Sequence, residues 1–190
     1  MVVSKRVRFI LSVIPLVLPM LCVAQSEPHH APKQQTDFDV ETPLQHPVVL
    51  PSGALNALKT SKLSANILRD CAENDGIKMD QIPSSWFAAS WIELSGGQSS
   101  GLVIRAQHGC FLGAHITQFW LLSKVDSNYH VVFAGRADAF RVLSTRTSSF
   151  RDVQLIFIMQ AGAQTNYVTF KYTNGEYKES GSRTERPYDN

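Results

Sequence analysis

The chain has 190 residues, with 18 Lys and Arg against 16 Asp and Glu and with 44% hydrophobic residues. This hydrophobic content excludes a disordered chain, and three cysteines are too few for a disulfide-rich scaffold. The formal net charge of +2 gives no basis for nucleic-acid binding, and the length suggests one domain.

The N-terminal residues have the pattern of an export signal. Lys5, Arg6 and Arg8 precede an apolar run over 9–23, which ends at the small residue Ala24. The run has about 15 residues, fewer than a membrane span needs. We therefore predict a Sec signal peptide over 1–24 and a periplasmic or secreted protein without a membrane span, with an uncleaved N-terminal anchor as the alternative.

Cleavage after Ala24 changes the charge of the chain. Three positive charges and no negative ones leave with the signal, so the remainder carries 15 Lys and Arg against 16 Asp and Glu, a formal −1. This balance argues against nucleic acid and against an anionic membrane as partners. Residues 25–47 are rich in Pro, Gln, His and Thr, which predicts a flexible linker.

A helical segment is predicted over 52–72, with Ser52 as its cap. Leu63, Ile67 and Cys71 follow one another at i, i+4 and i+8, which places Cys71 on a buried stripe. Thr60-Ser61 divides this segment into two short helices. The sequence therefore predicts a helical cover at the start of the domain.

From residue 86 to 179 the pattern changes to short β runs, followed by a polar tail over 180–190. Asn174-Gly175 is the strongest hairpin signal of the chain. The apolar run over 153–159 predicts a central strand covered on both faces. Eight strands are predicted, over 86–94, 101–107, 117–124, 128–134, 139–143, 151–159, 165–172 and 175–179.

The eight strands show a weak internal repeat of about four strands. Val153 follows Leu102 by 51 residues (153 − 102), and Tyr177 follows Tyr129 by 48 residues (177 − 129). A unit of this size matches one propeller blade, but two units cannot close a propeller. The fold class predicted is therefore α+β: an N-terminal helical segment packed on an antiparallel meander or a small two-sheet body over 48–179.

The strand–turn–strand units over 86–178 resemble FG-GAP/VCBS-type repeats. Segments 86–90, 109–114, 119–120, 151–152 and 174–177 also resemble uncharacterised secreted bacterial proteins with this layout. The resemblance implies a calcium loop with closely spaced aspartates. The matching turns, 95–100 and 144–149, contain no carboxylate, so calcium binding is not expected and no cofactor is predicted.

Two cysteines remain after removal of the signal. Because the secretory route is oxidising, Cys71 and Cys110 are predicted to form one disulfide, with two separate buried thiols as the alternative. The bridge closes a loop of 39 residues (110 − 71), for which loop entropy gives about 4 kcal/mol of stabilisation.

His108, Cys110 and His115 are the best candidates for chemistry. With Cys71 they offer N and S ligands for zinc, but their spacing matches no standard zinc finger. Cys110 with a neighbouring histidine is a candidate nucleophilic pair, with Asp126 or Asp138 orienting the base.

No local signature supports catalysis, so no catalytic or metal residue is predicted. Arg151-Asp152 is expected to form a surface ion pair, and Glu93 is expected to be exposed.

The predicted function is an exported, non-enzymatic binding module. Its candidate binding surface comprises Trp86, Trp120, His108 and His115, and an envelope protein or a glycan is the candidate partner. The alternative function is a secreted hydrolase that uses residues around His108, Cys110 and His115.

Overall fold

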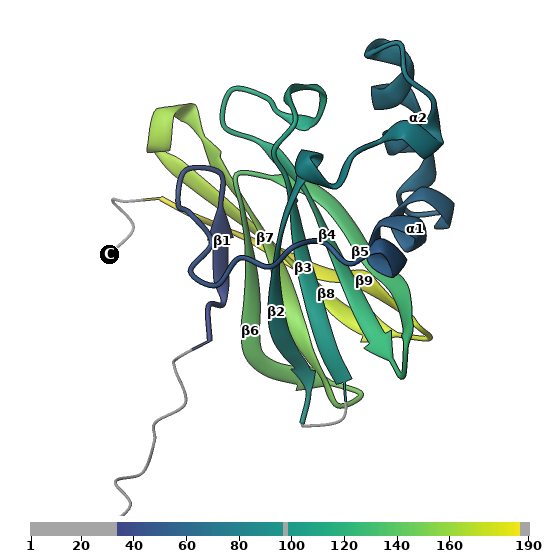
Figure 1. Ribbon diagram of the computed structural model, residues 1–190. Coiled ribbons are helices and arrows are strands. Elements are labelled where there is room, and N and C mark those ends of the chain that lie inside the picture. Colours follow the sequence, from purple (N-terminus) through teal and green to yellow (C-terminus); the bar gives the residue numbers. More distant parts are fainter. Residues whose placement is uncertain (1–33, 97–98, 187–190) are drawn as a thin grey trace, which may run out of the picture. The chain divides into compact units, whose positions relative to one another are not determined.

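The computed structural model describes residues 34–96 and 99–186, and the predicted signal peptide therefore lies outside the described residues. Two helices and two antiparallel sheets form the described part, which confirms the α+β class (Figure 1). The helices and the short 3-10 turns are α1 (Ser52–Thr60), α2 (Ala65–Asn74), η1 (Met79–Gln81), η2 (Ser84–Trp86), η3 (Gly109–Phe111) and η4 (Gln160–Gly162).

The helical segment is divided as predicted, because α1 ends at Thr60 and α2 begins at Ala65. Two details of the prediction are wrong. Ser52 is the first helical residue, and Pro51 holds the cap position without a side-chain hydrogen bond. Cys71 is buried, but Ile67 is 38% exposed, because the stripe that packs on the sheet runs through Leu68 and Ala72 instead.

All eight predicted strands are present, and they divide into two sheets. The first sheet has the order β2-β3-β4-β5 and the second has the order β1-β6-β7-β8-β9. The strands are β1 (Asp37–Asp39), β2 (Phe87–Ser95), β3 (Ser99–Ala106), β4 (Thr117–Val125), β5 (Asn128–Ala137), β6 (Ala139–Thr147), β7 (Phe150–Met159), β8 (Gln164–Thr173) and β9 (Glu176–Glu185).

Two local predictions in the second sheet can be compared with its structure. The hairpin at Asn174-Gly175 is confirmed: both residues have positive φ, 51° and 88°, as a type I′ turn between β8 and β9 requires. Strand β7 is central in its sheet, but only in part covered on both faces. Ile158 and Met159, at its C-terminal end, are 56% and 44% exposed.

The flexible linker predicted over 25–47 is wrong for its described part. Strand β1 pairs with β6, and Phe38 is fully buried against Phe140 with their ring centroids 6.2 Å apart. The Gln35 side chain donates a hydrogen bond to the Asp37 carbonyl and accepts one from the Gln45 backbone N–H. The predicted polar tail is corrected in the same way, because β9 continues to Glu185 through backbone pairing with β8.

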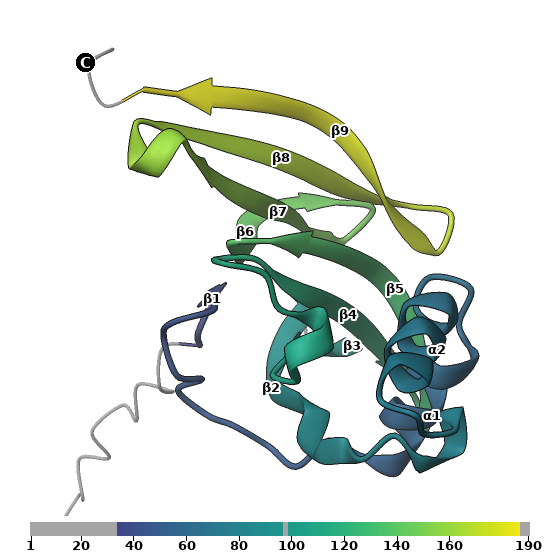
Figure 2. The same ribbon diagram turned by 90° about the horizontal axis from the view of Figure 1, so that it is seen from above.

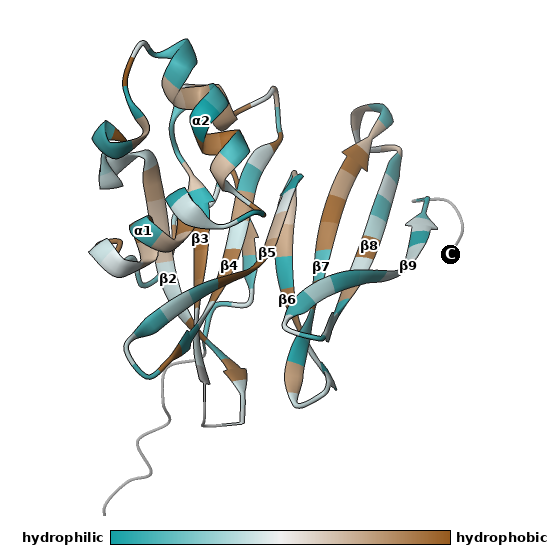
Figure 3. Ribbon diagram, turned by 90° about the vertical axis from the view of Figure 1, so that its right-hand side faces the viewer, coloured by the Kyte–Doolittle hydropathy of each residue, from teal (hydrophilic) through white to brown (hydrophobic). Residues whose placement is uncertain are grey.

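The helices and the two sheets form three layers (Figures 2 and 3). One apolar cluster lies between the helices and the first sheet and includes Leu58, Leu68 and Trp120. The other lies between the two sheets and includes Phe119 and Phe140. The first sheet is therefore buried on both faces. The chain crosses from one sheet to the other at a single residue, between β5 and β6.

The predicted four-stranded repeat corresponds to the division into sheets, with β2–β5 as the first unit and β6–β9 as the second. The third and fourth strands of each unit pair with one bulge. Val132 is the extra residue in β5 and Ser180 is the extra residue in β9. These residues are 48 positions apart (180 − 132), the same offset as between Tyr129 and Tyr177. The register thus supports the equivalence that the sequence pattern predicts.

The two units are stacked in the same orientation. The face of the first unit that lies away from the helices packs against the face of the second unit that carries Tyr177 and Val153. Tyr129 and Leu102 lie on the helix side of the first sheet, whereas their equivalents Tyr177 and Val153 lie between the sheets. Each pair occupies the same face of its unit. Within residues 34–96 and 99–186, no helix or further sheet packs on the opposite face of the second unit, although Gln154 on this face is only 6% exposed.

That outer face of the second unit carries polar residues where the first unit has apolar ones. Val103 and Leu121 are fully buried between the sheets, and their equivalents on the outer face are Gln154 and Thr169. The Gln154 amide donates a hydrogen bond to the Thr169 hydroxyl. A polar outer face is what a terminal repeat needs to end a stack in water.

Candidate functional site

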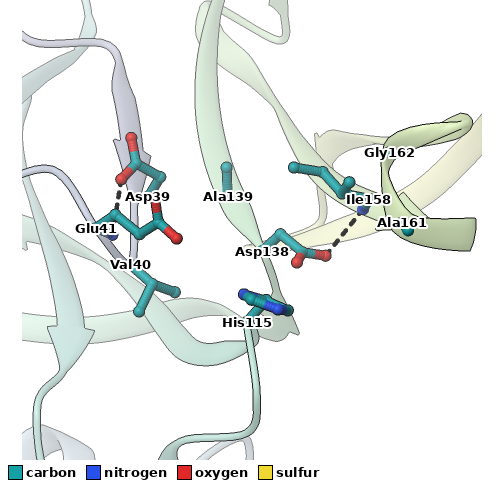
Figure 4. Close-up of a pocket in the computed structure, with 9 residues that line it drawn as sticks. All are labelled: Asp39, Val40, Glu41, His115, Asp138, Ala139, Ile158, Ala161 and Gly162. Atoms are coloured by element: carbon teal, nitrogen blue, oxygen red, sulfur yellow. Dashed lines mark hydrogen bonds between the residues drawn. The ribbon is translucent and has the colours of Figure 1, made fainter.

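The first candidate site is an acidic cavity of about 660 Å³ at one end of the two sheets (Figure 4). Its walls come from the end of β1, the β3–β4 connection, the β5–β6 crossing and the turn after β7. The lining residues are Asp39, Val40, Glu41, His115, Asp138, Ala139, Ile158, Ala161 and Gly162. Three carboxylates, those of Asp39, Glu41 and Asp138, line the cavity together with one histidine and several apolar side chains, so acidic groups outnumber basic ones in its lining.

A buried arginine holds the β1 wall of this cavity in place. Arg105, on β3, donates hydrogen bonds to the backbone carbonyls of Asp39 and Thr42. Burial lowers the pKa of Arg105, and the negative charge of Asp39 partly offsets that effect. Burial raises the pKa of Asp39, but hydrogen bonds from Thr42 and Glu41, together with Arg105, outweigh it and leave that pKa below its ordinary value. Asp39 is therefore ionised at neutral pH.

Asp138 supplies the most enclosed carboxylate of the cavity. It is the residue at which the chain changes sheet, and its side chain is only 7% exposed. Its backbone N–H donates to the Ile156 carbonyl, and its Oδ2 accepts a hydrogen bond of 2.9 Å from the Ile158 backbone N–H. These two bonds fix the position of the carboxylate at the cavity wall.

The second candidate site is the predicted disulfide between Cys71 and Cys110, which the structure contains. The two Cα atoms are 5.6 Å apart, an ordinary distance for a disulfide. His108 Nδ1 lies 3.2 Å from Cys110 Sγ and 3.8 Å from Cys71 Sγ. In this form Cys110 carries no thiolate, so the hydrolase predicted as the alternative function lacks its nucleophile.

The structure separates the residues of the predicted binding surface. Trp86 is 7% exposed and stacks on His108 with ring centroids 3.9 Å apart, whereas Trp120 is fully buried under the helices. Neither tryptophan can form an exposed surface, so this part of the prediction is wrong. Their positions follow from strand alternation, which turns both side chains toward the layer that the helices cover.

The two candidate histidines are also separated. His108 lies at the disulfide, whereas His115 is exposed and lines the acidic cavity. Among the described residues, Cys71, His108 and Cys110 form a cluster whose potential metal-ligand atoms all lie within 4.8 Å of one another. His115 is not part of this cluster. The zinc hypothesis, with His115 as a ligand, is therefore not supported by the geometry.

Two further sequence predictions concern charged residues. Glu93 is exposed as predicted and pairs with Arg146 at 3.1 Å. The surface ion pair at Arg151-Asp152 is wrong, because Asp152 is 4% exposed and its Oδ1 is buried without a hydrogen-bond partner. Arg151 instead donates to the backbone carbonyls of β6.

Sequence reasoning missed the acidic side chains of both candidate sites. Asp39 and Glu41 lie in the segment predicted as a linker, and Asp75, whose carboxylate lies 3.0 Å from His108 Nε2 at the disulfide, follows the predicted helical segment. For Asp138 the sequence predicts only that it orients a histidine beside Cys110. No local pattern marks these residues, because their neighbours in the site come from distant parts of the chain.

Comparisons of the chain with protein-family models, with curated proteins and with solved structures give no match. Within residues 34–96 and 99–186, no helix is long and apolar enough to cross a membrane. The structure thus establishes the fold, the disulfide and the acidic cavity.

Proposed function

We propose that the protein is an exported binding module whose acidic cavity receives a basic side chain of an envelope protein. The observation that carries the proposal is Asp138, a residue only 7% exposed at the wall of a cavity that Asp39 and Glu41 also line. The Ile158 N–H meets one of its carboxylate oxygens, and a positive group that also donates hydrogen bonds stabilises such a carboxylate further. A lysine or arginine side chain supplies both.

The lining of the cavity favours a basic peptide over a glycan. Val40, Ala139 and Ile158 provide apolar contact for the aliphatic part of a lysine or arginine, while the carboxylates receive its charged end. The lining contains no Phe, Tyr or Trp, and both tryptophans of the predicted surface are buried.

Export is the second part of the proposal. The N-terminal pattern is that of a Sec signal, and a disulfide is typical of proteins in an oxidising compartment. The mass of the protein recovered from its native cell tests this part. A chain that begins at Gln25 is expected, and a chain that retains residues 1–24 overturns the cleaved signal.

The cavity is tested with a tetralysine peptide and the same peptide acetylated on its side chains. We expect calorimetry to detect the first peptide and not the second. Asp138→Asn keeps an oxygen that accepts the Ile158 N–H bond but removes the charge, so binding is expected to weaken about tenfold or more, as for a close buried charge pair.

Glu179→Gln is the matched control, since it removes the same charge from an exposed position on β9. It is expected to leave binding unchanged. Equal weakening by both substitutions, or no binding of tetralysine by the unaltered protein, overturns the proposed site. The first result means attraction by overall charge, and the second means that the cavity does not bind basic side chains.

A further inference from the structure

The surroundings of the Cys71–Cys110 disulfide differ from those of a bond that serves only to hold the chain together. Both ring nitrogens of His108 have partners. Nδ1 faces the two sulfurs, and Nε2 lies 3.0 Å from the Asp75 carboxylate. A carboxylate, an imidazole and a sulfur in this spatial order form the arrangement that activates a cysteine nucleophile. The carboxylate orients the imidazole ring, and the ring accepts or donates the proton.

The orientation of the ring is fixed by a second contact. The Trp86 indole lies parallel to the imidazole, with 15° between the two planes, and Phe111 meets His108 edge-on. The ring therefore cannot turn away from the disulfide without losing these contacts. Asp75, in the turn after α2, and His108, before η3, come from the two segments that the disulfide joins.

The two sulfurs differ in their access to solvent. Cys71, on α2, is 3% exposed, whereas Cys110, in η3, is partly exposed. Both cysteines line a small cavity of about 180 Å³ that also contains Arg136 and Asp70. A thiolate that enters this cavity reaches the Cys110 side of the disulfide, where the Arg136 guanidinium attracts its negative charge and the Asp70 carboxylate opposes it.

We infer that Cys71–Cys110 is a redox-active disulfide that exchanges with a cysteine thiol of a peptide or protein. Cys110 is the sulfur attacked, His108 is the acid–base group, and Asp75 is the residue that positions His108. This activity is independent of the acidic cavity, because the residues of the two sites do not overlap.

The exchange balances in two steps. The incoming peptide thiol gives its proton to His108 Nδ1 and attacks Cys110 Sγ, which forms a mixed disulfide, while the bond to Cys71 breaks and Cys71 Sγ leaves as a thiolate that takes this proton from His108. A second peptide thiol then gives its proton to His108 Nδ1 and attacks the peptide sulfur of the mixed disulfide, which expels Cys110 as a thiolate that takes the second proton. Two peptide thiols are oxidised to one disulfide, and the protein is reduced to its dithiol.

Reduced glutathione is the probe of choice because it is a thiol peptide small enough to reach a partly exposed sulfur. The purified protein is mixed with it near neutral pH, and the dithiol is counted by alkylation and mass spectrometry over time. His108→Ala is expected to slow opening about tenfold or more, in the lower range of general acid–base effects. Asp75→Asn is expected to slow it by a smaller factor, with Asp75→Glu restoring part of the rate.

The matched control is His130→Ala, which removes an exposed histidine on β5 that belongs to neither site and is expected to leave the rate unchanged. Circular dichroism of each variant establishes that it is folded, and His108→Gln replaces His108→Ala should the latter unfold. The pH dependence of Cys110 alkylation in the reduced protein tests whether Asp75 acts by positioning His108, because a purely structural role of Asp75 would leave this dependence unchanged. The profile is expected to move toward higher pH in both His108 and Asp75 variants, as loss of a thiolate partner requires.

Three results overturn the inference. The first is a disulfide that glutathione does not open in the folded protein. The second is an opening rate that is the same in His108→Ala as in the unaltered protein. The third is protein that is isolated with bound zinc and two free thiols, which makes Cys71, His108 and Cys110 a metal site instead.

Discussion

The first and second four-stranded units have the same strand order and equivalent bulges but different neighbours. The β2–β5 unit is covered by helices on one face and by the second sheet on the other, whereas in the described part of the chain the β6–β9 unit packs against another layer on one face. The residues follow this difference: Phe119 and Leu121 are fully buried, while their equivalents Tyr167 and Thr169 are partly exposed. The same backbone pattern therefore has apolar residues on this face in the first unit and more polar residues on the equivalent face in the second. The difference corresponds to whether another layer packs against that face.

The largest expected effect is the loss of a large side chain between the sheets. Phe119→Ala is expected to lower the free energy of unfolding by about 3–5 kcal/mol, because it leaves a cavity at a fully buried position. The equivalent change, Tyr167→Ala, is expected to cost about 1 kcal/mol, since it removes an exposed contact with Arg183. Denaturant unfolding measures both, and equal costs would contradict the difference between the units.

The second comparison uses a glycine of the first unit and its buried equivalent in the second. A Cβ atom at Gly101 would lie 2.4 Å from Leu94 Cγ, so Gly101→Ala is expected to destabilise by about 1–3 kcal/mol. Asp152, 51 positions later (152 − 101), has a buried oxygen without a partner. Asp152→Ala is therefore expected to be neutral or stabilising in the same thermal or denaturant assay.

The third comparison concerns the tyrosines that begin the fourth strand of each unit. The Tyr177 hydroxyl donates a hydrogen bond of 2.7 Å to the Arg151 carbonyl, so Tyr177→Phe is expected to cost about 1 kcal/mol. Tyr129→Phe serves as its control and is expected to change stability by about 0.5 kcal/mol or less.

The Tyr177 hydroxyl also predicts a dependence of stability on alkaline pH. Burial raises the pKa of Tyr177, and the nearby Asp152 raises it further. The unfolded chain releases this proton near pH 10, where the folded protein still keeps it, so stability falls as the pH rises above about 10. Tyr177→Phe should remove this part of the fall. An unchanged alkaline profile in that variant would contradict the assignment.

The smallest effect on folding is expected from making the outer face resemble the buried one. Gln154→Val with Thr169→Leu installs the residues that Val103 and Leu121 supply in the first unit and removes both partners of one hydrogen bond. The folding free energy is expected to change little. Sedimentation is expected to show more self-association than for the unaltered protein, because Thr169 is partly exposed and a leucine at this position adds apolar surface.

Much of the fold could be predicted because its elements are specified locally. Side-chain alternation and turn residues identified all eight strands of the two units, and Asn174-Gly175 fixed the register of the last hairpin through its turn geometry. The division of the helical segment near Thr60 was also predictable. The pairing of Cys71 with Cys110 was predictable from the expected oxidising compartment and from the number of cysteines.

The candidate sites were predicted less completely. His108 and Cys110 were identified together because they are neighbours in the sequence, but Asp75 and Trp86 reach them only through the fold. The acidic cavity was not predicted at all, since each of its walls is an ordinary turn or strand end when considered alone.

The sequence by itself thus determined the strands, the helices, the four-stranded repeat and one disulfide. The strands, the helices and the repeat depend on local side-chain patterns and turn residues, and the disulfide depends on the number of cysteines. Only the tertiary structure decided which face of each unit is covered, that the polar segment around Phe38 becomes a strand, and that Asp138 is enclosed. These depend on contacts between residues tens of positions apart, whose free energy exists only once the layers have packed.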